Sequence, residues 1–219
     1  MRKVLFGITV SCLCIVNLLL IQDVNPEKSE FVTVSVKQLK SPEIRNRLSA
    51  RDALLKELKN AAKDTTLGEY TEIINELIAI AAEKREEYIV HDPKELAIEV
   101  LGEIGSIEAI PIFVEQVDFT YPSMRYILDA SLLNPYPCAR ALEKMDSLAV
   151  QGIFDYLGRA KSEELSEKRL DLYAWIIIET KGSKDLAKQV VLEEIKKASG
   201  KKRKELKRLL THFEKKKQD

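Results

Sequence analysis

A repeated pattern of apolar, small and turn-forming residues is the feature of this sequence that most constrains its fold. Three segments align at offsets of 41 residues (101 to 142) and 36 residues (142 to 178). The positions that share a residue type are Leu101, Leu142 and Ile178; Ala97, Cys138 and Ala174; Gly105, Asp146 and Gly182; and Ser106, Ser147 and Ser183. A small residue lets helices approach each other, Gly or Asp can end a helix in a left-handed conformation, and Ser can cap the next helix. A period of this length is typical of stacked helix pairs.

The composition also favours helices. The chain has 219 residues, of which 45% are hydrophobic and 32% charged, with only 8 Gly and 7 Pro. Lys plus Arg and Asp plus Glu both number 35, which is typical of helix faces that carry opposite charges. We therefore expect an all-α chain with one sizeable packed domain.

Helix boundaries can be placed from apolar spacing and capping residues. The segment 41–63 predicts a first helix capped by Ser41, and the segment 69–87 predicts a second. The expected inward side of the first helix consists of Ile44, Leu48, Leu55, Leu58 and Ala62. Asp92 and Pro93 predict the start of a third helix, with Glu95 completing a capping box.

The segment from Leu101 to Pro111, with the sequence LGEIGSIEAIP, resembles the turn between the two helices of a HEAT repeat, particularly of the short bacterial type. The resemblance covers roughly residues 93–199, with degenerate copies at 138–157 and 174–191. It implies an α-solenoid of stacked antiparallel helix pairs, which we expect to occupy residues 41–219. HEAT-like proteins commonly act as scaffolds, so the resemblance also implies a protein partner.

The first 24 residues have the pattern of an export signal or a membrane anchor. Arg2 and Lys3 precede the uncharged, mostly apolar run 4–21. No small-residue cleavage site is clear, so a cleaved signal peptide and an uncleaved anchor both remain open. Either would place the protein outside the cytoplasm, in the periplasm or another extracytoplasmic space, or on the membrane. Residues 25–40 are expected to form an extended linker between this segment and the helical domain.

No pattern in the sequence indicates catalysis. Metalloprotease, nucleophile-elbow, C-x-x-C and P-loop motifs are absent. Cys138, the one cysteine beyond the N-terminal segment, fits a small buried position, and the two histidines, His91 and His212, are expected to be exposed. We therefore expect no enzymatic activity, no cofactor and no metal.

The C-terminal end is strongly basic. Residues 194–219 carry nine Lys, two Arg and four acidic residues, a net charge of +7, which leaves −8 on residues 25–193. A basic helix is expected at about 201–217, with its cations at Lys201, Lys202, Arg203, Lys204, Lys207 and Arg208. Two interpretations are compatible with it: a helix that caps the solenoid, and a face that binds anionic lipid or another polyanion.

Together these features predict a non-enzymatic, exported or membrane-tethered scaffold that binds a protein. Its contact face would be formed by the second helices of the repeats, with Gln151, Asp155 and Lys188 exposed on it. The alternative is a binder of nucleic acid or of an anionic surface that uses the basic C-terminal helix. The export segment and the acidic body argue against nucleic acid, and an enzyme on a HEAT-like scaffold ranks third.

Overall fold

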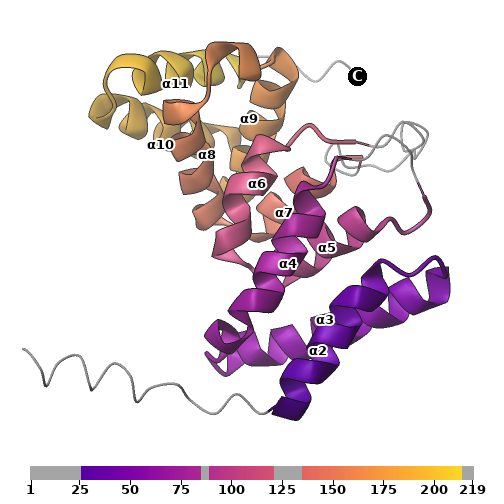
Figure 1. The fold of residues 1–219 in the computed structure, drawn as a ribbon. Helices are drawn as coiled ribbons and strands as arrows, with labels where there is room; N and C mark the ends of the chain where they lie inside the picture. The colour runs from indigo at the N-terminus through magenta and orange to yellow at the C-terminus, as the bar shows by residue number, and fades with distance from the viewer. Residues whose placement is uncertain (1–25, 85–88, 121–134, 214–219) are drawn as a thin grey trace, which may run out of the picture.

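The protein is described by a computed structural model that covers residues 26–84, 89–120 and 135–213, and every regular element in these ranges is a helix (Figure 1). The α-helices are α2 (Pro26–Leu39), α3 (Ile44–Lys63), α4 (Thr71–Ala82), α5 (Pro93–Glu103), α6 (Ile110–Glu115), α7 (Pro137–Lys144), α8 (Ser147–Arg159), α9 (Glu167–Lys181), α10 (Lys184–Lys197) and α11 (Gly200–His212). Short 3₁₀ turns precede three of them: η1 (Leu67–Tyr70), η2 (Ile107–Ala109) and η4 (Ser162–Glu164). The expectation of an all-α chain is confirmed for these ranges. The apolar run 4–21 lies outside them, and none of the described helices combines the length and apolar character that crossing a membrane requires.

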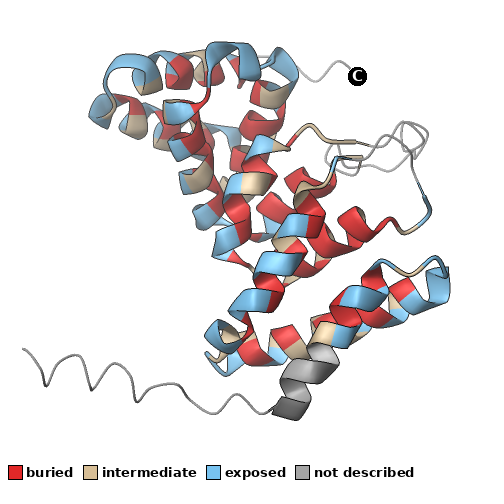
Figure 2. Ribbon diagram, viewed as in Figure 1, coloured by how far each residue is buried: buried red, intermediate tan, exposed pale blue. Residues whose placement is uncertain are grey.

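The helices pack in two rows that follow the order of the chain (Figure 1). In the first row α3, α5, α7 and α9 each contact the next, and in the second row α4 contacts α6 and α6 contacts α8. A continuous apolar core runs between the rows, and Figure 2 shows the buried residues on the inner sides of the helices. The last helix, α11, packs against α8, α9 and α10 at the C-terminal end.

The turns aligned in the sequence share a positive φ angle at one position, although ψ is −130° at Asp146 and −6° at Gly182. Gly105, Asp146 and Gly182 have φ angles of 66°, 53° and 71°, all in the range that L-residues rarely adopt. The aligned small residues Ala97, Cys138 and Ala174 are all buried. The sequence repeat therefore corresponds to a shared positive φ and a shared buried position, not to one turn geometry.

Two glycines set the distance between neighbouring helices. A Cβ atom added at Gly102 of α5 would lie 2.8 Å from Ala141 Cβ and 3.0 Å from Ala141 Cα on α7. A Cβ atom at Gly152 of α8 would lie 2.3 Å from Ile110 Cγ2 on α6. Both distances are too short for real carbon atoms, so the absence of a side chain permits the close contact in each row.

The segment expected to be an extended linker is a helix. Residues 26–39 form α2, which packs against α3 and α4. Val36 is 3% exposed and Leu39 is fully buried, so the C-terminal half of α2 is part of the core. The alternation of β-branched residues suggested an extended chain, but burial against two helices outweighs this local preference. Within the described residues the helical array thus already includes 26–39, ahead of residue 41.

The inward side of α3 also differs from expectation. The helix begins at Ile44, which is 45% exposed, and its buried residues are Arg47, Ala50, Leu54, Leu58 and Ala61. Because α3 lies between α2 and α5, two neighbours rather than one decide which side is buried. The Arg47 guanidinium is buried because it donates hydrogen bonds of 2.7–2.9 Å to four carbonyl oxygens, those of Ser41, Pro42, Val90 and His91.

Candidate binding surface

Helix α11 is amphipathic, and its apolar side is fixed in the core. Leu206, Leu209 and Phe213 are each at most 1% exposed. The helix spans Gly200–His212, so the expected basic helix is present from 201 to 212, and residues 214–217 lie outside the described ranges. This packing directs the remaining side of α11 to solvent.

Three of the six cations expected on this helix are engaged by neighbouring elements. Lys202 Nζ lies 2.7 Å from Glu194 and 3.6 Å from Asp155, and Lys201 Nζ donates a 3.3 Å bond to the Arg159 carbonyl. Arg208 contacts Glu205 at 2.8 Å and Glu167 at 3.2 Å, and donates to the Leu165 carbonyl. These contacts join α11 to α8, α9 and α10.

The other three cations face solvent together. Arg203, Lys204 and Lys207 are exposed, and no carboxylate oxygen lies within 4 Å of them in the described part of the chain. They lie within about one turn, or about 6 Å along the axis, on the same side of α11. A shallow hollow follows this side, and its described lining is Gly200, Arg203, Lys204, Lys207, Arg208 and Thr211. We call Arg203, Lys204 and Lys207 the basic stripe.

His212, expected to be exposed, is buried where α11 meets α9. Its Nδ1 atom lies 2.5 Å from Asp171 Oδ1, and its Nε2 atom lies 3.4 Å from Glu167 Oε2. The expectation was wrong because it rested on the polar sequence around His212. Burial here results from a contact with residues 41 positions earlier in the chain.

The three residues expected on the contact face of the second helices lie on α8 and α10. Gln151 and Asp155 are exposed on α8, where the Gln151 amide donates a 2.9 Å bond to Asp155 Oδ1. Lys188 is half-buried on α10, which packs against α9 and α11. Since Asp155 also faces Lys202, these side chains already interact with the protein itself.

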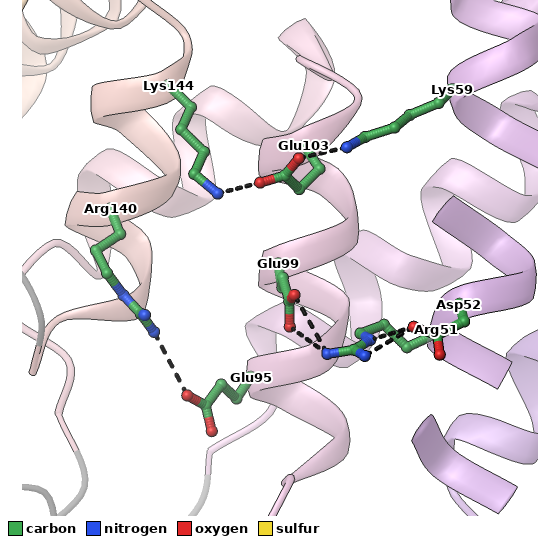
Figure 3. Close-up of polar contacts among 8 residues, drawn as sticks. All are labelled: Arg51, Asp52, Lys59, Glu95, Glu99, Glu103, Arg140 and Lys144. Atoms are coloured by element: carbon green, nitrogen blue, oxygen red, sulfur yellow. Dashed lines mark hydrogen bonds and ion pairs between the residues drawn. The ribbon is translucent and has the colours of Figure 1, made fainter. Parts of the chain in front are cut away.

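The first row carries a set of ion pairs between successive helices (Figure 3). Glu103 of α5 lies between Lys59 of α3 and Lys144 of α7, and these two ammonium groups lower the pKa of Glu103 to about 2. The same row holds two pairs at 3.4 Å, Arg51 with Glu99 and Arg140 with Glu95. The charges of these paired residues are therefore compensated within the row.

Two local expectations near these pairs have different outcomes. Asp92 caps α5, since its Oδ1 atom accepts a 2.8 Å hydrogen bond from the Lys94 amide. Glu95 does not complete a capping box but contacts Arg140 on the next helix of the row. Burial raises the pKa of Glu95, while Arg140 opposes this effect.

The described residues show little that could perform chemistry. Cys138 is buried, and desolvation raises the pKa of its thiol to about 12, as expected for a structural cysteine. Within residues 26–84, 89–120 and 135–213, no three His, Cys, Asp or Glu side chains converge in a way that could hold a metal ion.

Comparisons with known proteins identify no family. No protein-family model matches the chain, and no curated protein matches it. Two solved structures of engineered proteins are similar to it at 17% and 18% sequence identity, with TM-scores of 0.38 and 0.35. Both alignments cover 84% of this chain, but they cover 48% of the first engineered protein and 79% of the second. The chain thus spans about half the length of the first.

Proposed function

We propose that this chain is a non-enzymatic, HEAT-like helical-repeat scaffold that binds the acidic surface of a partner protein through the basic stripe. In this proposal residues 1–24 export the protein or tether it to a membrane. The positive φ shared by Gly105, Asp146 and Gly182, and the consecutive packing of α3, α5, α7 and α9, support the HEAT-like assignment.

The observation that carries the binding proposal is the contrast between the two kinds of cation on α11. Lys202 and Arg208 reach carboxylates of the same chain, whereas Arg203, Lys204 and Lys207 do not within the described residues. Exposed like charges within one turn repel one another, so an anionic partner gains from neutralising them. The rigid attachment of α11 to three other helices keeps these side chains on one face.

A second candidate function is the binding of nucleic acid or of an anionic lipid surface through the same stripe. A long polyanion would also meet the acidic body, because residues 25–193 carry a net charge of −8. A compact acidic patch on a protein can instead contact the stripe alone. The distribution of charge therefore favours a protein partner over an extended polyanion.

The test measures how tightly the full-length chain, in non-ionic detergent, binds three probes: a Glu-rich peptide, duplex DNA, and vesicles of anionic lipid. The variant Arg203→Glu, Lys204→Glu, Lys207→Glu removes the stripe, and Arg45→Glu, Lys56→Glu, Lys63→Glu makes the same charge change on exposed cations of α3. We expect peptide binding to be lost only in the first variant. Peptide binding that is absent, or is lost equally in both variants, would refute the proposal. Stripe-dependent binding of DNA or vesicles but not of peptide would favour the second candidate.

A further inference from the structure

A second set of uncompensated charges, of opposite sign, lies on the second row of helices. Glu72 and Glu76 of α4, Glu108 of η2 and Glu115 of α6 are all exposed. We call these four residues the acidic face. The two helices are neighbours, since α4 contacts both η2 and α6. Figure 2 shows exposed residues of α4 and α6 on the same side of the molecule.

The acidic face lacks cationic partners among the described residues. Its residues form no ion pair within 4 Å in those ranges, and the one polar side-chain contact given for them is a 2.9 Å hydrogen bond from Ser106 Oγ to Glu108. Glu76 lines a shallow hollow between α2 and α4 together with Lys37 and Lys40. Glu72, Glu108 and Glu115 are therefore the least compensated members.

The basic stripe and the acidic face cannot neutralise each other within one molecule. The stripe is on α11, which packs against α8, α9 and α10, whereas the acidic face is on α4, η2 and α6 (Figure 1). Both sets of side chains project from rigid helices, and Glu72 and Glu76 are one helical turn apart, as Arg203 and Lys207 are. The two surfaces thus have complementary charge, on separate parts of the same chain.

We propose that the basic stripe of one copy of this chain docks on the acidic face of a second copy. This inference rests on the proposed function and identifies the acidic partner as another molecule of the same protein. A reciprocal contact, in which each copy's stripe meets the other's acidic face, closes a two-fold dimer, whereas a one-way contact leaves a free stripe and a free acidic face for further copies. In both cases assembly grows with protein concentration.

The association depends on salt. The paired side chains are exposed, so their attraction is screened once the Debye length falls to about 10 Å near 0.1 M salt and below that at higher salt. We expect the average mass of the chain to rise with concentration in about 0.02 M salt and to return to that of the monomer in about 0.5 M salt.

The decisive experiment is a charge exchange followed by sedimentation velocity of the full-length chain in non-ionic detergent. One variant carries Arg203→Glu, Lys204→Glu and Lys207→Glu, and the other carries Glu72→Lys, Glu108→Lys and Glu115→Lys. Each variant alone juxtaposes like charges and should associate at least about tenfold more weakly than the unaltered chain. In an equimolar mixture every contact between the two different variants again joins opposite charges, and association should be restored.

The outcomes separate this inference from the proposed function. The acidic-face variant retains its stripe, so it should bind the Glu-rich peptide as the unaltered chain does. A chain that stays monomeric at low salt, or a mixture that fails to recover association, refutes self-docking, while peptide binding through the stripe leaves the proposed function standing. If the peptide does not bind either, both proposals are wrong.

Discussion

Glu103 of α5 and Lys144 of α7 lie 41 residues apart and form an ion pair between consecutive helices of the first row. This separation equals the offset at which the sequence repeats between residues 101 and 142. The carboxylate also meets Lys59 Nζ at 2.5 Å, so one side chain links three helices. At this pair, aligned positions of the repeat thus bring side chains from distant parts of the sequence into contact.

Replacing Glu103 with Gln should lower the free energy of unfolding at neutral pH by about 0.5–1 kcal/mol, because the carboxylate is partly exposed. Its pKa of about 2 in the folded state is lower than the ordinary value of 4.5. Its contribution is therefore complete above about pH 4.5 and is lost as the pH falls toward 2. Chemical denaturation at several pH values should show the difference between the two proteins shrinking over this interval. A difference that stays constant down to pH 2 would contradict the assigned ion pairs.

Gly102→Ala should destabilise the protein by about 1–3 kcal/mol, since the added methyl group meets the Ala141 backbone, which cannot move aside easily. Gly158→Ala is the matched control, because its Cβ would lie 3.4 Å from the flexible Lys202 side chain. At position 158 the higher helix propensity of Ala should leave the free energy of unfolding unchanged or raise it by up to about 1 kcal/mol. Thermal unfolding of both variants tests the close approach of α5 and α7, and equal effects would contradict it.

Arg47→Met should reduce the free energy of unfolding by about 3 kcal/mol, because it leaves four carbonyl oxygens without their donor. Arg45→Met, two residues earlier on the same helix and exposed, should change it by less than about 0.5 kcal/mol. Urea denaturation measures both. A small effect at Arg47 would mean that the guanidinium does not bridge the start of α3 and the segment before α5.

Ser183→Ala should lower the free energy of unfolding by about 1 kcal/mol, since Ser183 Oγ accepts a hydrogen bond from the Leu186 amide at the start of α10. Ser147 aligns with Ser183 in the sequence repeat, but it is the first residue of α8, and no side-chain bond caps that helix. Ser147→Ala should therefore have almost no effect. Similar losses of stability for both variants would show that the serines cap their helices alike.

Features that depend on neighbouring residues could be predicted from the sequence, whereas those that depend on distant ones could not. The turns at Gly105 and Gly182 and the cap at Asp92 follow from local backbone preferences. The helix α2 and the burial of His212 arise from packing against segments elsewhere in the chain. Their own sequences are polar or β-branched and give no sign of it.

The candidate surface shows the same division. The sequence identified the six cations of α11, because charge and helical spacing are local properties. The sequence could not show which of the six cations lack a carboxylate partner. The partners of Lys202 and Arg208 lie on α8, α9 and α10 as well as on α11 itself. The acidic face was missed, although its exposed Glu residues recur on two neighbouring segments. A search for like charges on the outward sides of the second helices would have found it.

The most direct test of the central claim, that the basic stripe binds an acidic protein surface, is calorimetric titration of the full-length chain with the Glu-rich peptide at two salt concentrations. We expect binding at about 0.05 M salt that weakens by about tenfold or more at about 0.3 M, because exposed ion pairs are screened. The Arg203→Glu, Lys204→Glu, Lys207→Glu variant should show no binding at either concentration. Binding that is unaffected by salt, or that survives this substitution, would contradict the claim.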